Sequence, residues 1–303
     1  MEAQKAKRKG KILIAEDGET LRTVLAKYLA REGFEPLEAA DGEKAIELYR
    51  TLRPEIVISD IMMPRMDGLS LLKEIHRINP AASVILMTGY GNEDILLKAL
   101  QGGAVNFFKK PFNMKELVLE IEKIAQYKEA GEQPALFCPD LVEETKVFRL
   151  VTTDAAYMPV INQIALQLPL LVNETEILNI KIGIEEMITN AIEHGNLGIS
   201  FQEKSSAIAD GRFGELVAQR MKDDKKGHRL VTVTSRLSRE LFQVTIRDEG
   251  NGFDWQALPD LSAGNLLSFS GRGVFLTKIY FDAVTYNAKG NEVTLLKRRT
   301  RES

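Results

Sequence analysis

Five short apolar runs alternate with five helix-period segments across residues 11–127, and no other feature restricts the fold as strongly. The runs are 11–15, 35–39, 55–59, 83–87 and 105–108, and the helical segments lie near 19–32, 42–52, 67–78, 92–101 and 113–127. Strands that alternate with helices at this spacing predict a doubly wound parallel sheet. Because the runs are almost continuously apolar, we expect helices on both faces of that sheet.

The second half of the chain has a different pattern, which predicts an α+β layer sandwich. We expect strands at 146–152, 230–238, 241–249, 283–287 and 292–298, and helices at 155–168, 174–194 and 273–281. The segment 197–229 is polar and has only weak periodicity. The expected organisation is a basic tail at 1–10, a first domain at 11–127, a linker at 128–145 and a second domain at 146–300.

Composition excludes several classes of protein. The chain has 40 basic and 43 acidic residues, so its net charge of −3 gives no general case for binding nucleic acid or an anionic membrane. The one cysteine, Cys138, excludes an intrachain disulfide and a cysteine-rich zinc site, and it suits a reducing, cytoplasmic compartment. The uncharged stretch 155–173 has the length of a membrane span, but its prolines and amides favour a buried amphipathic helix.

Polar groups follow four of the predicted strands. They are Glu16 and Asp17, Asp60, Thr88, and Lys110. Because the carboxyl ends of parallel strands share one edge, we expect these side chains to converge. Three carboxylates together suit Mg²⁺, and a carboxylate can attack a phosphoryl group whose charge a lysine and a hydroxyl then bind. Lys110–Pro111 is a candidate cis peptide bond.

A single aspartate at a strand end is more often a turn or helix-cap residue, so only the conjunction of these groups indicates a site. The conjunction resembles the receiver domain of bacterial response regulators in four motifs: EDGETLR, ISDIMMPRMDG, LMTGYG and FFKKPF. The resemblance covers residues 11–127 and implies a flavodoxin-like fold, with Asp60 as the acceptor of a phosphoryl group from a cognate sensor histidine kinase.

The same resemblance implies further roles for residues of this edge. Mg²⁺ would be held by Glu16, Asp17, Asp60 and the backbone carbonyl of Met62, and Glu16 stands where the family more often has aspartate. Phe107 takes the place of the family's switch aromatic, which is commonly tyrosine.

Two further groups of residues in the second half could bind a nucleotide. Glu186 and Asn190 are four residues apart and share one helix face, where an amide oxygen can bind Mg²⁺ and a carboxylate can accept a proton. A solvated helix rich in glutamate is the alternative for this pair. Asp248 lies at a strand end before Gly250 and Gly252, where backbone can approach a flat ligand and a carboxylate can accept a hydrogen bond from an amine such as that of adenine.

A second glycine-rich turn opens the last predicted helix. Gly271 and Gly273 flank Arg272 there, and the free N–H groups of a helix start favour phosphate. The order of these motifs resembles the GHKL-type ATPases over residues 146–298, and it is most similar to the anti-sigma-factor serine kinases, including the closing pattern FDAVTYNAKGNEVTLLK. The resemblance implies Mg²⁺ and ATP, with Asn190 on the metal and Asp248 on adenine.

A sensor histidine kinase is not favoured, because no helical hairpin with a phosphoacceptor histidine lies between 128 and 174. His76 lies inside the receiver pattern and His228 in the polar segment 197–229, and His194 is expected to pack or cap near the nucleotide pocket.

We therefore expect a response regulator whose output domain is a protein serine kinase, with Glu186 as general base. Its expected partner is an anti-sigma antagonist of the STAS type, with a sigma factor as a second partner, and whether the chain forms a homodimer stays open. One alternative is a nucleotide-dependent protein-binding switch, and another is ATP hydrolysis that drives a clamp. A DNA-binding output is not favoured, because no helix-turn-helix pattern follows the first domain.

Overall fold

The computed structural model describes residues 9–89, 93–130, 138–154, 157–255 and 272–299. The chain forms two compact units, Met1–Glu132 and Gln133–Ser303.

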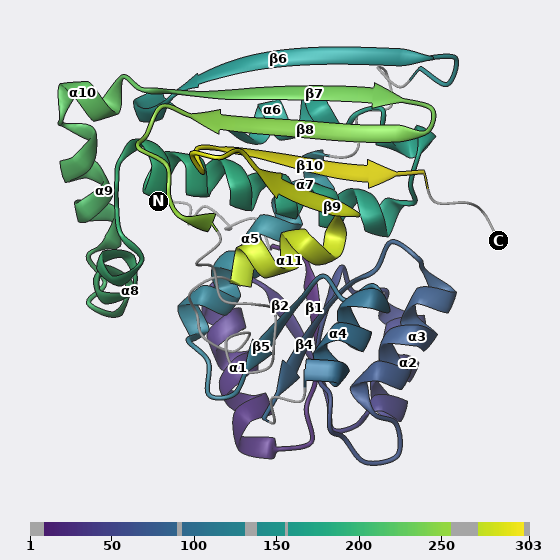
Figure 1. Ribbon diagram of the computed structural model, residues 1–303. Coiled ribbons are helices and arrows are strands. Elements are labelled where there is room, and N and C mark those ends of the chain that lie inside the picture. The colour runs from purple at the N-terminus through teal and green to yellow at the C-terminus, as the bar shows by residue number, and fades with distance from the viewer. Residues whose placement is uncertain (1–8, 90–92, 131–137, 155–156, 256–271, 300–303) are drawn as a thin grey trace, which may run out of the picture. The chain divides into compact units, whose positions relative to one another are not determined.

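The first unit is a five-stranded parallel sheet in the order β2-β1-β3-β4-β5. Its helices lie on both faces, with α1 and α5 on one and α2, α3 and α4 on the other (Figure 1). The elements are β1 Lys11–Ala15, α1 Glu19–Arg31, β2 Glu35–Ala39, α2 Gly42–Leu52, β3 Ile56–Asp60, α3 Gly68–Ile78, β4 Ser83–Thr88, α4 Glu93–Gln101, β5 Asn106–Lys109 and α5 Met114–Ala130.

Burial explains why the sheet is doubly covered. Every residue of β3 and β4 is buried, as expected of apolar strands in the middle of a parallel sheet. The predicted α/β fold class is confirmed. One boundary differs by more than a residue: α5 extends to Ala130, three residues past its predicted end at 127 and into the predicted linker.

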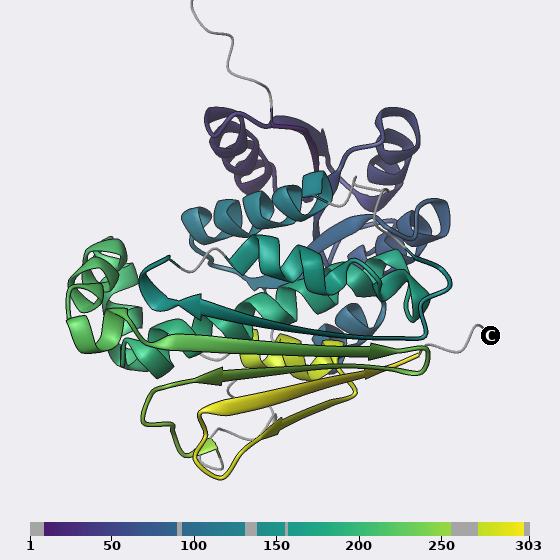
Figure 2. The same ribbon diagram turned by 90° about the horizontal axis from the view of Figure 1, so that it is seen from above.

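The second unit is a five-stranded antiparallel sheet in the order β6-β7-β8-β10-β9. The helices α6, α7 and α11 pack together on one face of it (Figure 2). The elements are β6 Glu143–Val151, α6 Tyr157–Ala165, α7 Glu174–Asn190, α8 Phe201–Ala209, α9 Phe213–Met221, α10 Asp224–Gly227, β7 Leu230–Ser238, β8 Leu241–Asp248, α11 Arg272–Tyr280, β9 Ala283–Tyr286 and β10 Glu292–Arg298, with short 3₁₀ helices at Thr152–Asp154 and Leu168–Leu170 and a π-helix at Ala191–Asn196.

Buried and partly exposed residues alternate along β7 and β8, as a sheet covered on one face requires. The helix α7 begins with a capping box, in which Asn173 and Glu176 each accept a hydrogen bond from the other's backbone N–H. The predicted layer sandwich is confirmed. None of the described helices is long and apolar enough to cross a membrane.

Several predicted boundaries in this domain are wrong. The strand expected at 146–152 begins at Glu143, inside the predicted linker. The helix expected at 155–168 ends at Ala165, because Pro169 belongs to a separate 3₁₀ turn. The helix expected at 174–194 is α-helical only to Asn190 and continues as the π-helix. The segment 197–229, which shows little periodicity, contains the three helices α8, α9 and α10.

Candidate functional site

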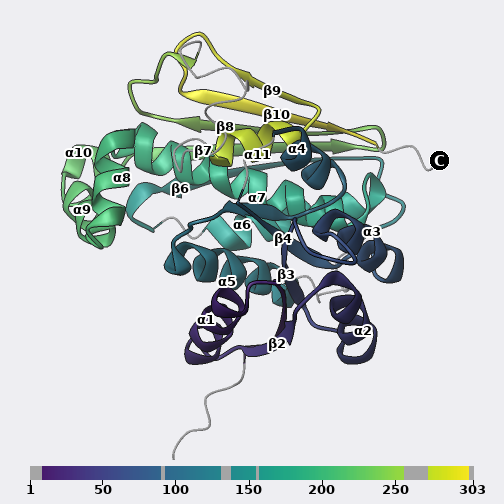
Figure 3. The same cartoon turned by 90° about the horizontal axis from the view of Figure 1, so that it is seen from below.

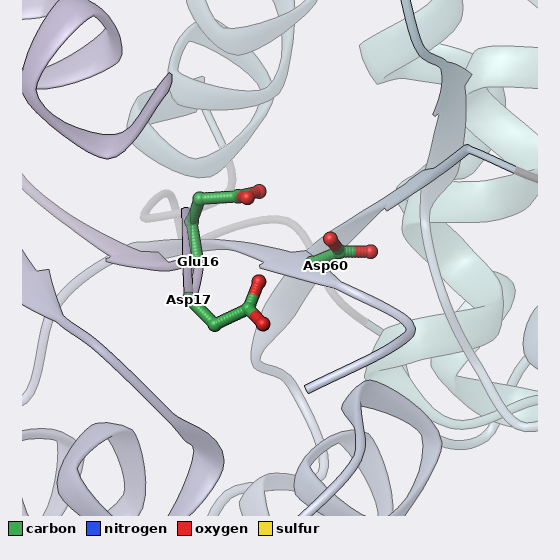
Figure 4. A group of neighbouring side chains, drawn as sticks. All are labelled: Glu16, Asp17 and Asp60. Atoms are coloured by element: carbon green, nitrogen blue, oxygen red, sulfur yellow. The ribbon is translucent and has the colours of Figure 1, made fainter. Parts of the chain in front are cut away.

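The carboxylates at the strand ends of the first domain converge, as the parallel sheet predicts. Oxygen atoms of Glu16, Asp17 and Asp60 all lie within 4.8 Å of one another. Figure 4 shows the three side chains directed toward one another from the ends of β1 and β3. Glu16 and Asp60 are buried, whereas Asp17 is exposed and open to a ligand from solvent. Three hard oxygen donors at this separation fit a Mg²⁺ ion.

Lys110 joins two of these carboxylates. Its Nζ lies 2.6 Å from Glu16 Oε2 and 2.5 Å from Asp60 Oδ2. Burial raises the pKa of Glu16, although the hydrogen bond from Lys110 opposes that rise. Burial alone would lower the pKa of Lys110, but its bonds to Asp60 and Glu16 outweigh burial and raise it. The lysine therefore stays charged between two carboxylates. The Lys110–Pro111 bond is cis, as predicted.

Backbone groups fix the two buried carboxylates. The N–H of Met62 donates to Asp60 Oδ1 at 3.1 Å, and the N–H of Gly18 donates to Glu16 Oε1 at 3.2 Å. Gly68 admits no side chain, because a Cβ there would stand 2.2 Å from the Asp60 carbonyl oxygen. The Met62 side chain itself is 64% exposed. The loop after β3 thus binds the Asp60 carboxylate through its backbone, and the start of α3 packs against the Asp60 backbone.

The two other residues predicted for this edge are buried. Thr88 ends β4, next to β5, and its carbonyl accepts a hydrogen bond from the Lys110 N–H at 2.8 Å. Phe107 lies in β5 and is 2% exposed.

Sequence reasoning missed an ion pair beside this edge. Arg65, in the loop after Asp60, has a positive φ of 65° and donates to Asp41, the N-cap of α2. The Arg65 hydrogen bond is the main reason that the pKa of Asp41 is lowered. The pair ties the loop after β3 to the loop after β2, and only the tertiary fold reveals it.

The second domain brings Glu186 and Gly273 together. Glu186 is half-buried on α7, and a Cβ at position 273, in the first turn of α11, would stand 2.1 Å from Glu186 Oε2. The buried hydroxyl of Thr277 donates to the Gly273 carbonyl at 2.8 Å and also lies 3.4 Å from the Gly183 carbonyl of α7. The two helices are therefore in close contact at this point. Asn190 ends α7 one turn beyond Glu186 and is half-buried.

Asp248 lies buried at the end of β8. Burial raises the pKa of its carboxyl, and a 2.8 Å hydrogen bond from the Gly250 N–H opposes that rise. A Cβ at Gly195 would stand 2.4 Å from the Asp248 carboxyl carbon, and a Cβ at Gly250 would stand 2.2 Å from the Gly195 carbonyl oxygen. The backbone of the π-helix thus lies directly against this carboxylate, which is the group predicted to bind adenine.

The loop after Asp248 meets the turn before β10. Gly252 has a φ of +77° and lies so close to the Lys289 carbonyl that a Cβ would stand 1.9 Å from that oxygen. Lys289 Nζ donates to the Gly250 carbonyl at 2.8 Å, and Asn291 Nδ2 donates to the Asp248 carbonyl at 2.8 Å. Lys289 and Asn291 were not predicted as site residues, although both belong to the closing pattern of the chain.

Asn196 is a second residue that sequence reasoning missed. It is fully buried, and its amide donates to Thr152 Oγ1 at 2.9 Å and to the Leu230 carbonyl at 3.2 Å. Its Oδ1 accepts from the Glu249 N–H at 2.9 Å, next to Asp248. The only sequence signal is its position six residues after Asn190.

The remaining predicted residues are placed only in part. His194 Nδ1 donates to the Ile199 carbonyl at 2.6 Å, and its ring stacks on Phe201 of α8. Arg272 begins α11, but Gly271 and the Arg272 side chain lie outside the described residues.

The family comparisons agree with this two-domain arrangement. A model of the response regulator receiver domain matches residues 12–122, and a model of the histidine kinase-like ATPase domain matches residues 151–297.

Curated relatives match the chain in part. Chemotaxis protein CheY of Thermotoga maritima is 34% identical over 38% of this chain and 98% of its own length. CheY of Bacillus subtilis is 37% identical over 37% of this chain and 95% of its own length. Regulatory protein AtoC of Escherichia coli is 37% identical over 38% of this chain but only 25% of its own length.

Proposed function

The chain belongs to the response regulator receiver family and carries a histidine kinase-like ATPase domain, and we propose that the receiver controls ATP-dependent protein serine kinase activity in that second domain. The proposed protein substrate is an anti-sigma antagonist of the STAS type, with a sigma factor as a second partner. The phosphoryl donor of the receiver is a sensor histidine kinase. We place this pathway in the cytoplasm, which suits the free thiol of Cys138.

In the receiver, an Asp60 carboxylate oxygen attacks the phosphorus of a phosphohistidine. The P–N bond breaks as the P–O bond forms, and the histidine nitrogen takes the electron pair. Lys110 is already 2.5 Å from Asp60, so its charge can pair with the incoming phosphoryl oxygens, and Thr88 can donate its hydroxyl to them. Glu16, Asp17, Asp60 and the Met62 carbonyl would hold Mg²⁺, and the bound ion would offset the negative charge of the donor and acceptor.

The first test is phosphorylation by a small donor. We expect acetyl phosphate to add one phosphoryl group to the full chain only when Mg²⁺ is present, and we expect Asp60→Asn to abolish it. Asp67→Asn is the matched control, because Asp67 only caps α3 and asparagine caps as well. Full labelling of Asp60→Asn would refute the assignment of the acceptor.

In the second domain, Glu186 is the proposed general base. It accepts the proton of the substrate serine while the serine oxygen attacks the γ-phosphorus of ATP and ADP leaves. One observation carries this proposal: the Glu186 carboxylate lies against Gly273 in the first turn of α11, where free N–H groups favour phosphate. Asp248 would accept the adenine amine, and Asn190 would help to hold Mg²⁺.

A comparison of two neighbouring glutamates tests the kinase. Each full-length variant is incubated with Mg·ATP labelled in the γ-phosphate and with candidate STAS-type proteins. Glu186→Ala should lower transfer to serine by about 10²-fold or more and leave ATP affinity nearly unchanged, since a general base contributes about 10²–10⁴-fold. Glu185→Ala, one residue earlier on α7, should retain transfer. If Glu186→Ala keeps the effect of the chain on its partner, the domain is a binding switch and not a kinase.

The same phosphoryl-transfer assay tests whether the receiver controls the proposed kinase activity. Beryllofluoride-treated protein should differ from Asp60→Asn by roughly 5–150-fold in transfer, the range that a coupling of about 1–3 kcal/mol gives. Equal transfer in both states would mean that the receiver serves only for localisation or dimerisation.

A further inference from the structure

A π-helix connects the proposed nucleotide site to the segment that follows it. It spans Ala191–Asn196 and begins directly after Asn190. Such single-turn elements are rare and occur frequently at functional sites. On one side of it, the backbone of Gly195 leaves no room for a Cβ beside Asp248, and Asn196 accepts the N–H of Glu249 at 2.9 Å. A shift of the Asp248 carboxylate toward Gly195 would therefore press directly on this turn.

The other side of the π-helix contacts α8. Lys204 Nζ forms an ion pair with Glu193 Oε2 at 2.6 Å. The ring of Phe201 stacks on His194 with 5.7 Å between the ring centres. Glu193 and His194 of the π-helix thus bind α8, whereas the next residue, Gly195, lies against Asp248.

Further polar contacts tie the rest of segment 197–229, which we call the insert, to the two residues directly after the π-helix. Arg220 of α9 donates to the Gly198 carbonyl at 3.2 Å, and Lys226 of α10 donates to the Leu197 carbonyl at 3.3 Å. In the part of the chain that the structure describes, α8 and α9 have no buried residue. The two helices therefore lack a fully buried apolar core, and elements with few buried contacts respond to small changes in their neighbours.

The insert lies at the end of the sheet that carries Asp248. Figures 1 and 3 show α8, α9 and α10 together at the end where β7 begins and β8 ends. We propose that helices α8–α10 sense nucleotide occupancy through the π-helix, so that a ligand on Asp248 changes the order of the insert. The inference rests on the proposed binding of adenine at Asp248. By thermodynamic linkage, a partner that binds the insert changes nucleotide affinity by the same factor.

Hydrogen exchange of the full chain tests this relay, with Mg·ADP as the probe and calorimetry as an independent measure of binding. Mg·ADP should slow exchange in peptides from 201–221 by about 5-fold or more, the lower end of typical coupling. Lys204→Ala and Glu193→Gln should each remove this effect. Glu193→Gln leaves Lys204 in place over the Phe213 ring, so loss of that cation–π contact cannot explain its result. Arg212→Ala is the matched control, because the Arg212–Asp210 ion pair, also 2.6 Å long, is internal to the insert.

The outcomes separate the relay from the proposed function. If Mg·ADP binds and exchange in 201–221 does not change, the relay is wrong and nucleotide binding stands. If Arg212→Ala abolishes the effect as fully as the other two variants, the insert responds to general loosening and the relay is also wrong. If Mg·ADP does not bind at all, both the relay and the proposed nucleotide site are wrong.

Discussion

Gly273 lies against the carboxylate of Glu186, so closely that a Cβ at position 273 would stand 2.1 Å from Glu186 Oε2. The obstructed atom is the end of a flexible side chain and not backbone. A larger residue at 273 would therefore turn Glu186 away and leave the helix intact. The glycine is needed for the position of Glu186, and this need is independent of any contact with phosphate.

Gly273→Ala should uncouple nucleotide binding from phosphoryl transfer. Turning Glu186 away removes the proposed base, so transfer to serine should fall by about 10²-fold, while ATP affinity should fall much less. Gly214→Ala is the matched control: Gly214 is also the second residue of a helix, and a Cβ there meets nothing within 4 Å. The control should gain up to about 1 kcal/mol of stability from helix propensity and keep full transfer. Equal transfer in both variants would mean that Glu186 is not the base.

Lys110→Met should destabilise the receiver when Mg²⁺ is absent. The buried carboxylates of Glu16 and Asp60 would lose the cation that lies within 2.6 Å of both. Removing one partner of a fully buried pair costs about 3–5 kcal/mol, and we expect about 1–3 kcal/mol here because Lys110 is partly exposed. Saturating Mg²⁺ should restore more stability to the variant than to the wild type. Scanning calorimetry of the full chain measures both effects.

The pH dependence of that variant has a defined sign. Burial already raises the pKa of Glu16, and without Lys110 the folded state would take up a proton still more readily. The difference in stability between the wild type and Lys110→Met should therefore shrink as pH falls. It should grow as pH rises through the raised pKa of Glu16. Lys109→Met, on the exposed neighbour of Lys110, should show no such deficit. Identical calorimetric curves for the two variants would contradict the ion-pair argument.

Much of the receiver could be predicted, because its strands are continuously apolar and its polar groups follow them directly. The convergence of Glu16, Asp60 and Lys110 follows from the geometry of a parallel sheet alone. The Asp41–Arg65 pair could not be predicted, since the two residues are 24 positions apart and meet only when two loops fold over the same edge. Pattern reasoning finds the elements, and it does not find contacts between loops.

The second domain was less predictable for a physical reason. No described residue of α8 or α9 is fully buried, and each helix has only nine residues, so its apolar pattern is short and weak. The start of α8 did carry a signal, the capping box formed by Ser200 and Glu203. The π-helix is only six residues long and continues α7 directly, and no side-chain pattern marked it.

The lifetime of phosphorylated Asp60 should depend on Met62. This side chain and that of Tyr90, which lies outside the described residues, are predicted to flank the route of the attacking water, so their bulk should slow hydrolysis. Replacing both with serine should shorten the half-life severalfold, measured by loss of label from the phosphorylated chain. Met62 is 64% exposed, so its own replacement should hardly affect stability. Met63→Ser is the control, and an unchanged half-life in the double variant would contradict the prediction.

Asp248→Asn should weaken nucleotide binding. The amide can turn its NH₂ toward the adenine amine, so that a donor faces a donor. Loss of one hydrogen bond to a charged group is worth about 1.5–3 kcal/mol, so affinity should fall on the order of tenfold to a hundredfold. Calorimetry with Mg·ATP measures this, and unaltered affinity would show that adenine is not bound here.

The same substitution should stabilise the empty domain in a pH-dependent way. Burial raises the pKa of Asp248, so the folded state takes up this proton at a higher pH than the unfolded chain does. The wild type should therefore lose stability as pH rises from the ordinary pKa of aspartate through the raised value, whereas Asp248→Asn has no proton to lose. The amide oxygen of the variant can still accept a hydrogen bond from the Gly250 N–H. The variant should therefore exceed the wild type in free energy of unfolding by an amount that grows across this pH window and then levels off. Urea unfolding followed by the fluorescence of Trp255, the single tryptophan, reports on this domain, and parallel stability curves for the two proteins would rule out a raised pKa at Asp248.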